Sequence, residues 1–177
     1  DDANAQSADA ATARTQGRYT RWNADLSRLQ NVNRRARLYL SLRGQGSGDN
    51  LDSSEQFVLG GPGSVRGYDV GVLAGASGWL ATLELRHELA LPISGLSEAR
   101  LFLDHGALSI NARPWTNAPN RARLSSAGVG VNWIGPDQWS MRLQVAAPVG
   151  SEPELIDKPA SARAWLHVAR GLCSCRW

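Results

Sequence analysis

The sequence predicts an all-β protein built as an antiparallel meander, and two features support this fold class. Apolar and polar residues alternate with a period of two in successive stretches from residue 18 onward, as they do in half-buried strands. Clusters of Gly, Pro, Asn and Asp separate these stretches. Because short hairpin connections cannot join parallel strands, a doubly wound α/β fold is disfavoured.

The alternating stretches predict about seven strands. The first, 18–30, is the least regular. In 36–43, three leucines and an alanine share one face, and 79–89 repeats this pattern with Glu84 and Arg86 on its polar face. His87 falls on the apolar side of that stretch, near its end. The other predicted strands are 100–106, with Phe102, Asp104 and Gly106 on one face, 127–133, 139–145 and 163–169.

Length and composition restrict the class of protein further. The 177 residues suit one domain or a piece of a larger one, and 42% hydrophobic content argues against disorder. No apolar run approaches the roughly 18 residues that a membrane-spanning helix needs, whereas a membrane-spanning strand needs only about 9–11 alternating residues. The net charge of +3 is spread along the chain, so a nucleic-acid interface is not favoured.

The sequence also lacks the usual patterns of catalytic and metal sites. There is no G-x-S-x-G nucleophile turn and no Gly-Lys pair of a phosphate-binding loop. The three histidines lie too far apart for metal-ligand spacing, and Cys173 and Cys175 are too close for a C-x-x-C site. We therefore expect no enzymatic activity, no metal and no cofactor, and we interpret the two cysteines as structurally incidental.

Alternation alone leaves open which face of the sheet is buried. A soluble β-sandwich would bury the apolar face, whereas an outer-membrane barrel would turn that face to lipid and the polar face to a wet lumen. Trp79, Trp133 and Trp139 lie at strand ends on the apolar side, as in an interfacial aromatic girdle. Seven strands are fewer than the even number, about eight or more, of single-chain bacterial barrels, so a barrel would require further strands upstream.

The segment 55–71, EQFVLGGPGSVRGYDVG, is the most informative part of the chain. It contains Val65, Arg66, Gly67 and Tyr68, and about 35 residues later the chain reads Phe102-Leu103-Asp104-His105-Gly106. These stretches resemble, in order, the V-R-G-[YF] signature of the sixth extracellular loop and the F-x-D-x-G strand motif of the Omp85/two-partner-secretion transporter superfamily. The spacing is most similar to the haemolysin-activator (ShlB/FhaC/HecB) branch.

The resemblance implies the C-terminal part of a transmembrane outer-membrane β-barrel. Residues 1–17 would be a polar lead-in or loop, and residues 18–177 would form barrel strands with a long lumenal loop at about 60–78. The family barrel has about sixteen strands preceded by periplasmic domains, so we expect this chain to lack its early strands and those domains.

The resemblance also implies a role for the two motifs. The loop would fold back into the lumen, and Arg66 at its tip would reach Asp104 beside Phe102. Gly106 would leave space for the loop and Gly67 would permit a tight tip. Glu84 and Arg86 face the same way and would extend the network.

The implied function is secretion of a partner protein of haemolysin or adhesin type through the pore, in the outer membrane of a Gram-negative bacterium. The expected partners are that secreted protein and the lipid bilayer, with no nucleic acid. Two alternatives remain open at this stage. One is an assembly factor of the same superfamily that inserts other outer-membrane proteins, and the other is a soluble β-sandwich binding module.

Overall fold

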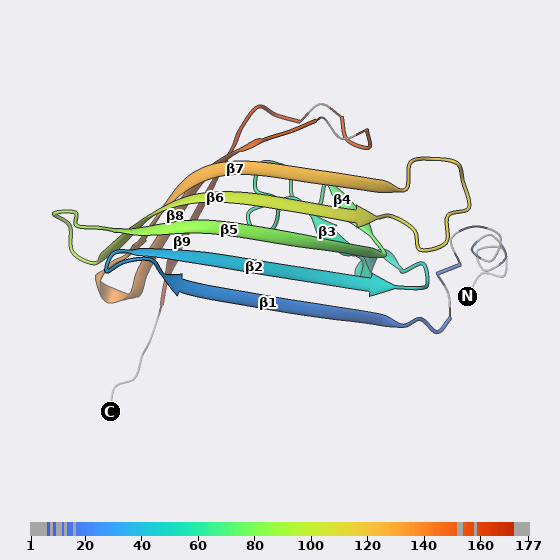
Figure 1. The fold of residues 1–177 in the computed structure, drawn as a ribbon, viewed down its shortest axis with the longest axis horizontal. Helices are drawn as coiled ribbons and strands as arrows, with labels where there is room; N and C mark the ends of the chain where they lie inside the picture. The colour runs from blue at the N-terminus through green and yellow to red at the C-terminus, as the bar shows by residue number, and fades with distance from the viewer. Residues whose placement is uncertain are drawn as a thin grey trace.

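The computed structural model describes residues 7, 9, 12, 14, 15, 17–151, 154–157 and 159–171. Most of the predicted lead-in over 1–17, and both Cys173 and Cys175, lie outside the described residues. Within the described part, the main element is one seven-stranded antiparallel sheet in consecutive order (Figure 1). Its strands are β1 (Arg21–Asn31), β2 (Ala36–Ser47), β5 (Ser77–Leu89), β6 (Leu96–Ser109), β7 (Arg121–Ile134), β8 (Trp139–Pro148) and β9 (Arg163–Arg170).

The predicted antiparallel meander is confirmed. The first strand begins at Arg21 and not at residue 18, and the other strands are longer than alternation indicated. Strand β7 begins at Arg121, whereas the sequence predicted a strand from 127. The adjacent polar residues Ser125 and Ser126 interrupt the alternation and conceal the first half of this strand. That half is nonetheless paired, with Arg121 opposite Ser109 of β6, because the ladder is set by the neighbouring strand.

A small two-stranded ribbon was not predicted. Strands β3 (Phe57–Leu59) and β4 (Leu73–Gly75) pair antiparallel and lie behind the sheet in Figure 1. A 3-10 turn, η1 (Ser53–Glu55), precedes β3, and a second, η2 (Pro136–Gln138), joins β7 to β8. Three-residue strands are too short to produce a recognisable alternation, which is why the sequence did not reveal the ribbon.

The core of the described chain lies between this ribbon and the inner face of the sheet. Leu59 and Leu73 of the ribbon pack with Leu80, Leu108 and Leu124 of the sheet. Leu59 is completely buried, and Leu124 is 1% exposed. The loop that follows β3 therefore starts from a fixed point on the inner face of the sheet.

The opposite, outer face of the sheet is apolar and open. In strands β2, β5, β6, β7, β8 and β9, large outward-facing side chains are exposed: Leu38, Leu40, Leu42, Leu83, Leu85, Leu101, Leu103, Val129, Val131, Met141, Leu143, Val145, Leu166 and Val168. Within the described residues, no second sheet covers this face. A soluble sandwich is therefore not favoured, because it would bury the apolar face and expose the polar one.

Tryptophans mark both ends of the apolar band. Trp22 and Trp79 lie near the end of the sheet from which the longer connections emerge, over 48–76, 110–120 and 149–162. Trp133 and Trp139 lie near the other end, where the turns span 32–35, 90–95 and 135–138. Among the described residues, no helix combines the length and the apolarity needed to cross a bilayer.

Candidate functional site

The connection from β3 to β4 folds back on itself and places its tip against the inner face of the sheet. Gly60 and Gly61 have φ values of +100° and +98°, a region that glycine adopts without strain. The amide of Gly61 donates to the carbonyl of Tyr68 at 3.2 Å, and the amide of Ser64 donates to the carbonyl of Gly61 at 3.0 Å. These bonds close the loop around Arg66.

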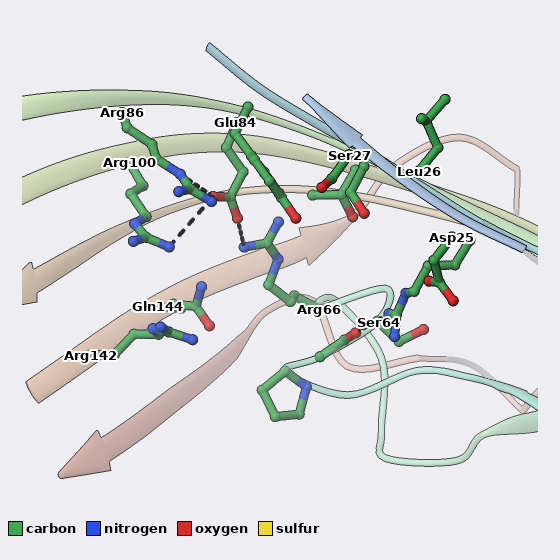
Figure 2. A pocket seen from close by; sticks show the side chains of 16 residues that line it. Asp25, Leu26, Ser27, Ser64, Arg66, Glu84, Arg86, Arg100, Arg142 and Gln144 are labelled. Atoms are coloured by element: carbon green, nitrogen blue, oxygen red, sulfur yellow. Dashed lines mark hydrogen bonds and ion pairs between the residues drawn. The ribbon is translucent and has the colours of Figure 1, made fainter. Parts of the chain in front are cut away.

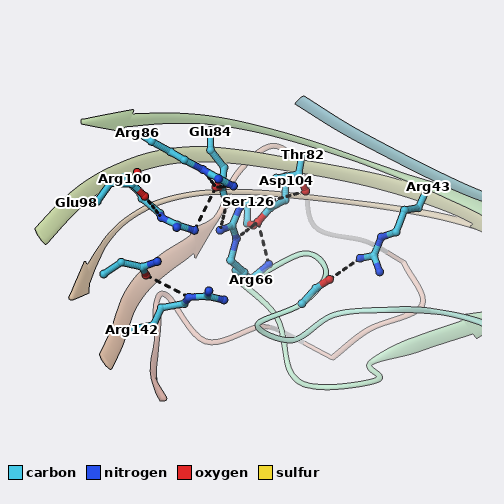
Figure 3. A network of polar contacts seen from close by, with 12 residues as sticks. Arg43, Arg66, Thr82, Glu84, Arg86, Glu98, Arg100, Asp104, Ser126 and Arg142 are labelled. Atoms are coloured by element: carbon cyan, nitrogen blue, oxygen red, sulfur yellow. Dashed lines mark hydrogen bonds and ion pairs between the residues drawn. The ribbon is translucent and has the colours of Figure 1, made fainter. Parts of the chain in front are cut away.

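Arg66 forms a two-pronged ion pair with Asp104 on β6 (Figure 3). Its Nε donates to Oδ2 at 2.8 Å, and its Nη2 donates to Oδ1 at 2.7 Å. The backbone amide of Arg66 also donates to Oδ2, at 3.2 Å. Arg66 is 4% exposed and Asp104 2%, so both charges have left water and depend on each other.

Two hydroxyl groups complete the surroundings of the Asp104 carboxylate. Thr82 on β5 donates to Oδ1 at 3.1 Å, and Ser126 on β7 donates to Oδ2 at 3.1 Å. Both residues are direct register partners of Asp104, one on each neighbouring strand. Sequence reasoning missed both hydroxyl donors, because ordinary Thr and Ser residues carry no signal until the strand register is known.

A second carboxylate, Glu84 on β5, extends the ion-pair network (Figure 2). Its Oε1 accepts from Arg66 Nη1 at 2.7 Å, and its Oε2 is 2.7 Å from Arg86 Nη2. Arg100 on β6 approaches the same Oε2 at 3.5 Å and pairs with Glu98 at 2.9 Å. The structure thus brings Glu84 and Arg86 to the Arg66–Asp104 pair, and it adds Arg100, which the sequence did not single out.

Phe102 supports the arginine from one side. The Arg66 guanidinium carbon lies 3.5 Å from the centroid of the Phe102 ring, in cation–π geometry. The ring extends across β7 at Gly128, where an added Cβ would lie 2.4 Å from the Phe102 Cζ. Phe102 can occupy this position because residue 128 has no side chain.

Gly67 and Gly106 both lie where another part of the chain comes very close to the backbone. The sequence predicted a tight tip at Gly67 and space for the loop tip at Gly106, and the structure differs in both cases. Gly67 does not have a positive φ. A Cβ there would lie 2.8 Å from the Pro148 nitrogen and 2.8 Å from the Ser126 Cβ, so glycine lets the tip approach β7 and β8. A Cβ on Gly106 would lie 2.8 Å from Leu59 Cδ2, so its space admits β3 rather than the loop tip.

Val65 and Tyr68, the two remaining motif residues, join the apolar core. Val65 is completely buried and Tyr68 is 2% exposed. Both belong to the cluster that contains Leu59, Leu108 and Leu124. Burial raises the pKa of the Tyr68 phenol. The motif therefore combines the ion-paired Arg66 with two buried side chains, Val65 before it and Tyr68 after it, that anchor the loop in the apolar core.

Strand β9 holds the loop from a second direction. Trp165 Nε1 donates to the carbonyl of Arg66 at 2.8 Å, and Arg163 Nη2 pairs with Asp69 Oδ2 at 2.5 Å. From β2, Arg43 donates to the carbonyl of Gly63. Sequence reasoning missed these contacts, although Trp165 on the polar face of its strand was a detectable irregularity.

The polar network borders a groove of about 510 Å³ on the inner face of the sheet (Figure 2). Its wall contains Arg66, Glu84, Arg86, Arg100 and Arg142. Within the described part of the chain, no group of three or more His, Cys, Asp or Glu side chains is arranged to hold a metal ion. The buried ion pair of Arg66 and Asp104 joins the tip of the loop to the inner face of the sheet, and we refer to this pair as the latch.

Comparisons with known proteins point to one family. The family of the haemolysin secretion/activation protein ShlB/FhaC/HecB matches residues 2–133, a range that includes both motifs. The heme/hemopexin transporter protein HuxB of Haemophilus influenzae strain 86-028NP is 26% identical over 158 residues, which are 88% of this chain and 27% of HuxB. The chain therefore spans about a quarter of the length of the curated relatives it matches.

Two solved structures are similar in fold. CdiB from Escherichia coli matches with a TM-score of 0.73 and 26% identity, over 86% of this chain and 27% of its own. CdiB from Acinetobacter baumannii matches with a TM-score of 0.66 and 21% identity, over the same two shares. The second likeness is one of fold alone.

We expect Gly128→Ala to loosen the loop, because the new methyl group would meet the Val145 carbonyl oxygen at 2.3 Å and the Phe102 Cζ at 2.4 Å, and would displace the ring from beneath Arg66. Trypsin, which cleaves after accessible arginines, should then cut the folded full-length protein after Arg66 at least several times faster. Gly130→Ala is the matched control, because a Cβ at Gly130 on the same strand also meets a carbonyl oxygen of β8, that of Leu143 at 2.9 Å, and has no Phe102 atom among its nearest neighbours. Equal protection of Arg66 in both variants would contradict this role of Gly128.

We expect Asp104→Asn to weaken the latch more than Glu84→Gln does. Asp104 accepts three bonds from Arg66, whereas Glu84 accepts one and is shared with Arg86. Breaking a buried pair from one side costs about 3–5 kcal/mol. The same tryptic assay measures the difference, and faster cleavage in Glu84→Gln than in Asp104→Asn would contradict the assigned order.

Proposed function

The chain belongs to the haemolysin secretion/activation protein family ShlB/FhaC/HecB, and on that premise we propose that it forms part of an outer-membrane β-barrel that secretes a partner protein. The observation that carries the proposal is the buried pair of Arg66 and Asp104, which holds a loop against the polar face of a sheet whose apolar face is open. This inverted arrangement suits a wall between lipid and a wet lumen.

The proposed location is the outer membrane of a Gram-negative bacterium, with lipid against the exposed leucines and valines. The relatives support this proposal, since HuxB is a heme/hemopexin transporter and the family is one of secretion and activation proteins. We infer that the partner of this chain is an exported protein of haemolysin or adhesin type. No nucleic acid takes part in the proposed function.

The proposed mechanism is passage of an extended polypeptide along the polar face. The groove beside the loop is lined by arginines, carboxylates, hydroxyls and amides, which offer a moving chain many exchangeable hydrogen bonds. The Arg66–Asp104 latch would keep the loop in a defined place beside this path. Transport of this kind makes and breaks no covalent bond, so we propose that the protein is a transporter and has no enzymatic activity.

The assembly factor of the same superfamily is the less favoured function. The matching family is the branch of secretion and activation proteins, and its match covers both motifs. No contact in the described part of the chain favours the insertion of other barrels over secretion.

We expect Arg66→Ala in the full-length protein to reduce export of the partner severely while the barrel still assembles. The alanine would leave the Asp104 carboxylate buried without its cation, whereas Glu84 would keep Arg86 and Arg100. Export is measured as partner protein outside the cell, and assembly as heat-modifiable mobility of the barrel. Arg142→Ala is the matched control, because Arg142 lines the groove and bonds to Asn132 rather than to the loop. Normal export by Arg66→Ala would refute the latch.

We expect a charge on the outer face to be far more costly than one on the inner face. Leu40 faces outward and is 48% exposed, and its neighbour Ser41 lines the inner groove. In a bilayer, Leu40→Arg should lower the free energy of unfolding by about 2–4 kcal/mol, because an arginine near the midplane contacts lipid. Ser41→Arg should cost much less. Equal losses for the full-length protein in lipid vesicles would contradict the proposed orientation.

A further inference from the structure

A groove of about 960 Å³ lies at the end of the sheet with the long connections, apart from the loop latch. Its walls include Trp22 on β1, Trp79 on β5, and Arg121 and Arg123 on β7. The registers place all four side chains on the outer face. Trp79 is the register partner of Ala107, and Ala107 is the register partner of Arg123. In the same way, Ser77 pairs with Ser109, and Ser109 pairs with Arg121.

The floor of the groove is made of small residues. Gly46, Ser77, Ala107 and Ser109 line it, so backbone and short side chains form its base. The Trp22 indole lies across Gly46, where an added Cβ would be within 2.4 Å of the ring. The result is a shallow trough with aromatic rings along one side and guanidinium groups along the other.

The two arginines in this trough differ from those elsewhere on the outer face. Arg121 and Arg123 are exposed, and their side chains have no hydrogen bond or ion pair with the residues that the structure describes. Near the opposite rim, Arg28 donates to Gln30, and Arg170 lies over the Trp139 ring. The guanidinium groups at the long-loop rim thus remain available for an external anion.

We propose that this trough binds the phosphate group of a lipid headgroup in the outer leaflet. The proposal rests on the proposed function, which puts the outer face in the membrane. In such barrels the longer loops face outward, so the rim with Arg121 and Arg123 meets the outer leaflet. Tryptophans favour the interface, and arginine forks match phosphate oxygens.

The charges around the trough favour one negative group. Glu154 lies in the wall and contributes one carboxylate against the two arginines, which leaves one net positive charge among these three side chains. Below the trough, Leu42, Leu83 and Leu103 belong to the exposed apolar band, where the acyl chains of the same lipid would lie. A free phosphate ion would use the arginines alone, whereas a lipid would use both features.

The test measures lipid binding by the full-length protein purified in detergent. Bisphosphorylated lipid A is titrated against the same lipid with its phosphates removed, and bound lipid is counted by native mass spectrometry. We expect wild-type protein to bind the phosphorylated lipid at least about tenfold more tightly. Arg121→Gln with Arg123→Gln should remove that preference, because both charge-assisted contacts are lost. Arg28→Gln with Arg170→Gln is the matched control and should retain the preference.

Three results would overturn the lipid site. These are equal binding of the two lipids by wild-type protein, an unchanged preference in the Arg121 and Arg123 variant, and an equal loss in the control variant. Competition by inorganic phosphate at the same concentration as lipid A would also overturn it, since that would indicate a site for a free anion. If export remains normal and sensitive to Arg66→Ala while the lipid preference is absent, the further inference fails and the proposed function stands.

Discussion

The buried ion pair between Arg66 and Asp104 is the interaction on which the rest of the inner face depends. Two charges removed from water are tolerated only when their hydrogen-bonding capacity is satisfied. Thr82 and Ser126 supply hydroxyls to the carboxylate, and Glu84 takes the remaining side of the guanidinium. The three adjacent strands β5, β6 and β7 must therefore keep one register for these contacts to form, and the contacts in turn stabilise that register.

The distribution of polarity through the sheet is the reverse of that in a water-soluble protein. A water-soluble sheet is stabilised by burial of its apolar face. Here the completely buried side chains of Val65 and Leu59 belong instead to the loop and the ribbon, which lie on the polar face. The apolar outer face is left without protein cover in the described part of the chain. This polarity suits the proposed barrel wall, with lipid on the apolar side and a wet lumen on the polar side, where the loop lies.

The sequence predicted the parts of the site that follow from alternation and from contiguous motifs. A period of two placed Phe102 and Asp104 on one face, and the loop motif pointed to Arg66 as their partner. The ribbon of β3 and β4 escaped prediction because three residues make no period. Trp165 escaped because its bond to the carbonyl of Arg66 spans 99 positions of the chain, a distance that no local pattern can reveal.

The contacts from β9 alter what the loop does mechanically. Trp165 and Arg163 lie on a strand at the edge of the described sheet, and they bond to the same loop that Asp104 holds from near its middle. The loop is therefore a strut inside the curved sheet, connected to β2 through Arg43 and to β9 through two side chains. A strut attached on both sides resists flattening of the sheet. The ion pair of Arg66 with Asp104 lies between these attachments, so the loop is held by β2, by β6 and by β9 at separate points of the inner face.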